Sequence, residues 1–148
     1  MERIHPMLVH FPIALILFGV FCDLLRVRLR GEQVHFGLVG LWCTTAGTVM
    51  LIPVMGSGLL AQTFQPVPNE QVLDVLNWHE RLSYILALWF GGLVGWRWDA
   101  FGQKPDVMPW GYRLAATLGA ILIIGTASLG GELVYKHGMA VEKSTARP

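Results

Sequence analysis

Four long runs of predominantly apolar residues, separated by short polar segments, make up most of the chain. The runs are too long for strands and do not alternate in polarity, so the pattern predicts α-helices. A helix needs about 20 apolar residues to cross the roughly 30 Å hydrocarbon core of a bilayer. We therefore predict an all-α protein, a four-helix transmembrane bundle that forms one domain over residues 1–148, with spans at about 7–25, 36–60, 75–96 and 112–135.

The third run gives the weakest signal of the four. Its uninterrupted apolar stretch, residues 82–96, is too short to cross a bilayer alone. A spanning helix must also include His79, Glu80 and Arg81. These polar side chains are then expected at the membrane boundary or just inside it.

The direction of the spans follows from the positive charges between them. Cytoplasmic loops are enriched in Lys and Arg. The segment 61–74 between the second and third runs contains neither residue type. Lys and Arg instead follow the first run and the third run: Arg26, Arg28, Arg30, Arg97, Lys104 and Arg113. We predict that both termini lie on the outer, periplasmic side of the bacterial inner membrane.

Composition agrees with a lipid environment and narrows the function. Hydrophobic residues make up 53% of the chain and charged residues only 14%, whereas soluble domains carry about 25% charged residues. A net charge of +1 argues against nucleic acid binding, which requires a basic surface. Two cysteines in apolar runs suggest packing rather than a disulfide framework. No motif for a catalytic nucleophile or for nucleotide binding is evident. The sequence leaves enzymatic activity open. It also suggests no internal repeat.

Histidines gather at the predicted outer ends of the helices. Because the helix direction alternates, His10, His79 and His137 are expected at similar depth. Ionisable groups at membrane depth are costly and tend to mark functional sites. Imidazoles from different helices can ligate a haem. We predict one b-type haem near the outer face, with Arg81 near its propionates, transferring electrons with a quinone or a redox partner protein.

Other interpretations of the same residues stay open. His10, His79 and His137 with Glu132 could hold zinc or copper in a metal-binding or small transport protein. The polar residues could also only order the bundle of a non-catalytic accessory subunit. In that case His137 ends a helix before Gly138, and Glu132 pairs with the lysine one turn later. The sequence leaves the oligomeric state open, a homo-oligomer included.

Two further histidines are expected to have no role in the site. His5 precedes the first predicted helix and is interpreted as a bystander. His35, at the cytoplasmic start of the second predicted helix, is interpreted as a surface residue. Because the inner half of the bundle then has only His35, the sequence argues against a second haem.

The two ends of the chain carry recognisable motifs. Residues 5–12 read His-Pro-Met-Leu-Val-His-Phe-Pro, and residues 130–138 read Gly-Gly-Glu-Leu-Val-Tyr-Lys-His-Gly. Both resemble the opening and closing motifs of a bacterial family of small four-helix inner-membrane proteins of unknown function. The resemblance implies a four-helix membrane protein. The family's recurring histidines, matched here by His10, His79 and His137, are similar to those of haem-binding membrane cytochromes by analogy.

Overall fold

A computed structural model describes residues 4–25, 33–64, 69–103 and 108–139, and within these ranges every regular element is a helix. The all-α fold is therefore confirmed. Val9 interrupts the first predicted helix, so that two helices lie where one was predicted. The helices are α1 (Ile4–Leu8), α2 (His10–Leu25), α3 (Gln33–Phe64), α4 (Glu70–Gln103) and α5 (Trp110–Tyr135).

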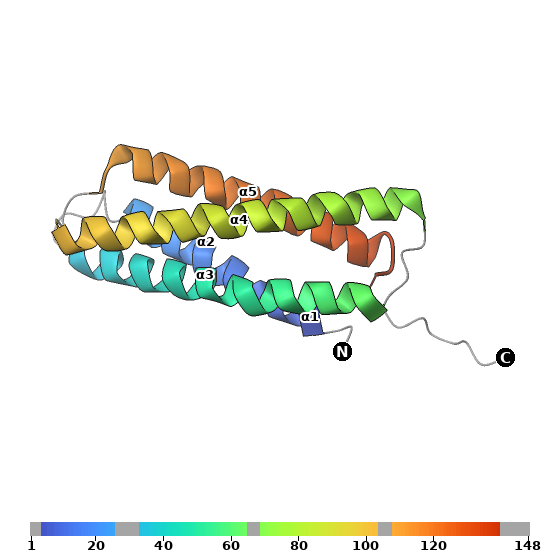
Figure 1. Ribbon diagram of the computed structural model, residues 1–148. Helices are drawn as coiled ribbons and strands as arrows, with labels where there is room; N and C mark the ends of the chain where they lie inside the picture. The colour runs from blue at the N-terminus through green and yellow to red at the C-terminus, as the bar shows by residue number, and fades with distance from the viewer. Residues whose placement is uncertain (1–3, 26–32, 65–68, 104–107, 140–148) are drawn as a thin grey trace.

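The helices form an elongated bundle of two hairpins. The first hairpin consists of α1, α2 and α3, and the second consists of α4 and α5; within each, the helices pack closely against one another. Contacts of α3 with α4 and of α2 with α5 join the hairpins. In Figure 1, α1, the end of α3, the start of α4 and the end of α5 lie at one end of the bundle. We call this the α1 end, and the other the α2 end.

The core lies between the two hairpins. Large side chains exposed on the outside of the bundle include Leu88 and Ile52, which are 79% and 72% exposed. Apolar exposure on this scale is unfavourable in water but suits lipid. The buried core cluster comes from α2, α4 and α5 and comprises Ile16, Val20, Leu86, Phe90, Leu93, Tyr112, Ala116 and Ile123.

Three helical stretches in the described part of the chain are long and apolar enough to cross a membrane: Ile4–Leu25, Phe36–Phe64 and Trp110–Tyr135. Helix α4 is not among them, which reflects its polar first half. It is nevertheless one continuous helix of 34 residues, about 50 Å long, and it lies alongside the others (Figure 1). A fourth crossing by α4 therefore stays a prediction.

One premise of the orientation argument is wrong. Arg97 is not a loop residue, because α4 continues to Gln103 and the arginine is only 3% exposed. Arg113 likewise lies within α5. The remaining basic residues of the two connections lie outside the described residues: Arg26, Arg28, Arg30 and Lys104. The side of the membrane on which the termini lie stays a prediction.

Candidate functional site

His79 attaches α4 to α5 near the α1 end. Its Nδ1 lies 3.0 Å from the carbonyl oxygen of Thr126. The half-buried imidazole rests on Gly130, where an added Cβ would lie 3.1 Å from the His79 Cε1. Glycine at this position thus leaves space for the ring between the two helices.

His5 makes the same kind of contact in the first hairpin. Its Nδ1 lies 3.0 Å from the Val54 carbonyl oxygen and 3.0 Å from the Ser57 Oγ. The ring rests on Gly58, where an added Cβ would lie 3.0 Å from the His5 Cε1. The prediction that His5 precedes the first helix is wrong, because it lies within α1 and joins that helix to α3.

These two contacts determine the tautomer of both imidazoles. A carbonyl oxygen can only accept a hydrogen bond, so each Nδ1 must carry the proton and donate it. In the neutral ring, Nε2 then keeps its lone pair, which is the arrangement of a metal-ligating histidine. No described residue hydrogen-bonds to the Nε2 of His5 or to that of His79.

His10 and His137 lie in different settings from His79. His10 is the exposed first residue of α2. His137 follows α5, where Gly138 has a φ of 66°. The N–H of Met139 donates to the Leu133 carbonyl at 2.9 Å. The interpretation of His137 as part of a helix ending is confirmed.

The neighbouring charged side chains make local contacts. Glu132 Oε1 accepts a bond from Lys136 Nζ at 2.7 Å and lies 3.7 Å from His137 Nε2, so the expected pairing one turn apart is confirmed. Arg81 is exposed, and its Cζ lies 5.7 Å from the centre of the Trp78 ring.

The predicted three-histidine cluster is not evident. Within the described ranges, no group of three or more His, Cys, Asp or Glu side chains could hold a metal ion. A zinc or copper site built from His10, His79, His137 and Glu132 thus gains no support. The structure instead gives His5 and His79 the same kind of contact, one in each hairpin. The side chain of His35 lies outside the described residues.

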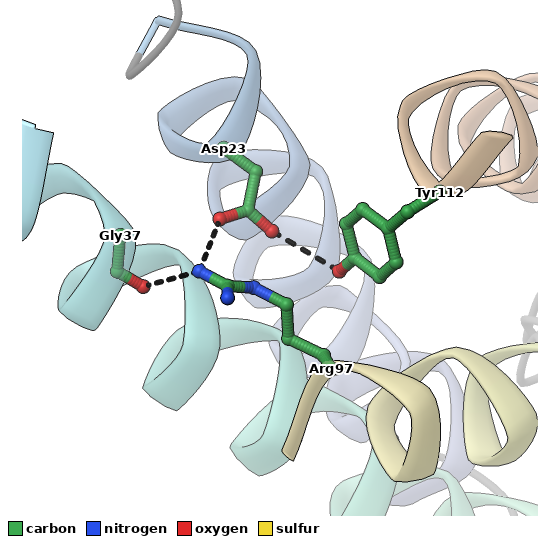
Figure 2. Close-up of polar contacts among 4 residues, drawn as sticks. All are labelled: Asp23, Gly37, Arg97 and Tyr112. Atoms are coloured by element: carbon green, nitrogen blue, oxygen red, sulfur yellow. Dashed lines mark hydrogen bonds and ion pairs between the residues drawn. The ribbon is translucent and has the colours of Figure 1, made fainter. Parts of the chain in front are cut away.

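A buried ionic cluster at the α2 end was missed by the sequence analysis (Figure 2). Arg97 Nη2 lies 3.4 Å from Asp23 Oδ1 and donates to the Gly37 carbonyl at 3.2 Å. The Tyr112 hydroxyl donates to Asp23 Oδ2 at 3.1 Å. Each of the four long helices contributes one of these residues, and the side chains of Asp23, Arg97 and Tyr112 are 1%, 3% and 2% exposed.

A sequence signal for this cluster exists. Asp23 falls inside the first apolar run, and Arg97 stands between Trp96 and Trp98. Opposite charges within apolar runs usually pair in a membrane protein. Treating Arg97 as a loop residue concealed the pair.

Comparison with known proteins places the chain in a family. Residues 2–143 match the model of DUF2231, which is described as a predicted membrane protein. The chain belongs to the DUF2231 family. The recognition of a membrane family of unknown function is thereby confirmed. No curated protein and no solved structure gives a significant match. Because the description of DUF2231 names no activity, a functional argument must rest on the site itself.

Proposed function

We propose that this DUF2231 protein binds one b-type haem at the α1 end of the bundle, between His5 and His79, and transfers electrons there. The observation that supports the proposal is the tautomer of the two imidazoles. Each donates Nδ1–H to a helix carbonyl and keeps the Nε2 lone pair for a metal. In most metal-ligating histidines, the ring nitrogen that does not bind the metal donates a hydrogen bond that orients the ring.

The number and placement of ligands favour haem over a zinc or copper ion. A b-type haem needs only two protein ligands, one on each side of the ring plane, whereas zinc sites use three or four. His5 belongs to the first hairpin and His79 to the second, so the two can approach a flat group from opposite sides. Helix α1 packs on α2 and α3 but not on α4 or α5 within the described ranges. The helix backbones that carry the two histidines therefore stay apart at this level.

The surroundings suit an electron-transfer site near the membrane surface. When bound, haem supplies one-electron chemistry, while the protein orients the ring and sets its surroundings. Arg81 is exposed beside His79 and presents a cation to which propionate carboxylates could bind. A quinone in the lipid or a redox protein outside the membrane is the expected electron partner. With four crossings and basic connections facing the cytoplasm, this end faces outward from the inner membrane.

Absorption spectroscopy of the full chain tests the proposal. The protein is expressed with adequate haem, purified in detergent, and measured oxidised and then reduced with dithionite. We expect a sharp Soret band that shifts on reduction, with distinct α and β bands. His5→Ala and His79→Ala should each lose the bound haem, and with it the six-coordinate spectrum, because each deletes one ligand.

Two matched variants separate this ligand pair from the one predicted from the sequence. His10→Ala and His137→Ala should keep the wild-type spectrum, since neither side chain is held as His5 and His79 are. Loss of the spectrum in His10→Ala but not in His5→Ala would restore His10 as the ligand. A flat visible spectrum of haem-replete wild-type protein would refute haem binding altogether.

The main alternative is an accessory subunit in which the histidines only join helices. The observation in its favour is that His5 joins α1 to α3 and His79 joins α4 to α5, with no cofactor required. This alternative predicts a colourless protein that co-purifies with a larger membrane complex. Quantitative pull-down from detergent-solubilised membranes measures that association directly.

A further inference from the structure

The two hairpins make equivalent contacts at constant sequence offsets. His79 follows His5 by 74 positions, and Gly130 follows Gly58 by 72 positions. In both hairpins the imidazole of the first arm rests on the glycine of the second. In both, the accepting carbonyl lies four residues before that glycine, at Val54 and at Thr126.

The same relation recurs in the middle of the bundle. An added Cβ at Gly47 would lie 2.6 Å from Ile16 Cγ1, and one at Gly119 would lie 2.7 Å from Phe90 Cζ. Phe90 follows Ile16 by 74 positions, and Gly119 follows Gly47 by 72. The two contacts are therefore equivalent, with a larger side chain in the second hairpin.

The relation holds a third time at the α2 end. Asp23 packs against Gly40, and the Arg97 guanidinium carbon lies 5.9 Å from the centre of the Tyr112 ring. The offsets are again 74 for the charged pair and 72 for Gly40 and Tyr112. Asp23 and Arg97 thus occupy equivalent positions, and they bind each other across the interface between the hairpins.

These three levels describe a repeat that the sequence analysis did not find. The offset falls by two between the first and second arms because 16 residues lie between Asp23 and Gly40 but only 14 between Arg97 and Tyr112. Both hairpins begin at the α1 end (Figure 1), so they are parallel repeats related by an axis along the bundle. Parallel repeats of this kind occur in membrane transporters, where the axis lies along the membrane normal.

We propose that the chain consists of two copies of one helical hairpin, and that the Asp23–Arg97 pair restricts each hairpin to a partner of the other kind. The 3.4 Å contact between Asp23 and Arg97 places both residues close to the axis that relates the repeats. Two first hairpins meeting across that axis would bring Asp23 against Asp23. Two second hairpins would bring Arg97 against Arg97.

Like charges are strongly repelled in this environment. Asp23 is only 1% exposed and Arg97 only 3%. Charges interact far more strongly in a low dielectric than in water. Only the pairing of unlike hairpins joins opposite charges. The charged pair therefore selects the pairing of unlike hairpins because it makes the pairing of like hairpins unfavourable. This is a well-attested use of buried polar groups.

Charge complementation between full-length chains tests this selection. Asp23→Arg gives a chain with Arg at both positions, and Arg97→Asp gives a chain with Asp at both. Two differently tagged chains are co-expressed, solubilised in detergent, and captured through one tag. The combination of the two variants should be captured roughly tenfold more efficiently than two wild-type chains, because only exchange of hairpins between chains restores opposite charges.

Matched combinations decide the outcome. When both tagged chains carry Asp23→Arg, or both carry Arg97→Asp, capture should not exceed the wild-type level. These chains should also accumulate poorly. If the mixed combination is captured no better than these, the proposal is overturned. The double exchange Asp23→Arg with Arg97→Asp keeps opposite charges in one chain and should accumulate better than either single variant. Accumulation no better than that of the single variants would also overturn it.

Discussion

The two ends of the bundle contain buried polar groups of opposite character. At the α1 end, His5 and His79 each hydrogen-bond to a helix carbonyl through Nδ1, and no described residue hydrogen-bonds to their Nε2 atoms. At the α2 end, Asp23, Arg97 and Tyr112 bind one another. Asp23 follows His5 by 18 residues and Arg97 follows His79 by 18, which is about 27 Å of helix. This separation is close to the roughly 30 Å thickness of a hydrocarbon core.

Under the proposed function, the difference separates a structural site at the α2 end from a cofactor site at the α1 end. Groups that bind each other, as at the α2 end, need no ligand. Groups with one coordinating atom left over, as at the α1 end, are suited to binding one. Substitutions at the α2 end should therefore chiefly change stability, whereas substitutions at the α1 end should chiefly change cofactor binding.

The largest loss of stability is expected from Asp23→Leu. It removes the carboxylate whose Oδ1 lies 3.4 Å from the buried Arg97, and removing one member of a buried ion pair typically costs about 3–5 kcal/mol. The free energy of unfolding can be measured by SDS titration of the helical circular dichroism signal. Asp23→Leu combined with Arg97→Leu should recover most of the loss, because an apolar pair needs no charge compensation. A single variant as stable as wild type would contradict a structural role for the pair.

Tyr112→Phe should have the next largest effect. It removes the hydroxyl that donates to the buried Asp23 carboxylate, and hydrogen bonds to charged groups contribute about 1.5–3 kcal/mol. Tyr84→Phe is the matched control, since the Tyr84 hydroxyl donates to Glu80 at an exposed site. The same SDS titration should show little change for Tyr84→Phe. Equal losses of stability in the two variants would mean that burial of the ionic cluster at the α2 end adds no stability.

A smaller loss is expected from Gly119→Ala, midway between the two ends. The added methyl group would meet the Phe90 ring, and overpacking of this kind costs about 1–3 kcal/mol. Gly125→Ala on the same helix is the control, because nothing lies within 4 Å of its added Cβ. That variant should be stabilised by up to about 1 kcal/mol through helix propensity. Thermal unfolding in detergent should therefore show a lower unfolding temperature for Gly119→Ala than for Gly125→Ala.

At the α1 end, His79→Ala should remove any bound haem while changing the stability of the haem-free protein only modestly. The variant loses one hydrogen bond to the Thr126 carbonyl, which contributes about 0.5–1.5 kcal/mol. Haem content by the pyridine haemochrome assay and SDS titration of haem-free protein measure the two effects separately. A loss of stability as large as that of Asp23→Leu, with haem content unchanged, would reverse the comparison between the ends.

The smallest effect is expected from Lys136→Ala. It removes an exposed ion pair with Glu132 one helical turn away, and exposed pairs of this kind contribute little to stability. The variant should match wild type in SDS titration and in haem content. Loss of haem in Lys136→Ala would instead indicate that the side chains around His137 belong to the site.

The outcomes for individual residues show where sequence reasoning succeeded and where it failed. The local pairing of Glu132 with Lys136 could be predicted because residues four apart on a helix lie on one face. The position of His5 could not, because it depends on a break at Val9 and on the surface that Gly58 presents. Depth was predicted for His10, His79 and His137, but depth does not specify which way a side chain points around its helix.

The sequence by itself determined that the chain is helical and suited to a membrane. These properties follow from long apolar runs, and each run acts largely independently of the others. Only the tertiary structure decided which polar groups meet: His5 with Val54 and Ser57, His79 with Thr126, and Asp23 with Arg97 across the hairpin interface. Such contacts depend on how each helix is rotated and how closely its neighbours approach. Those features are set by packing against glycines on another helix, so they cannot be read from any one segment alone.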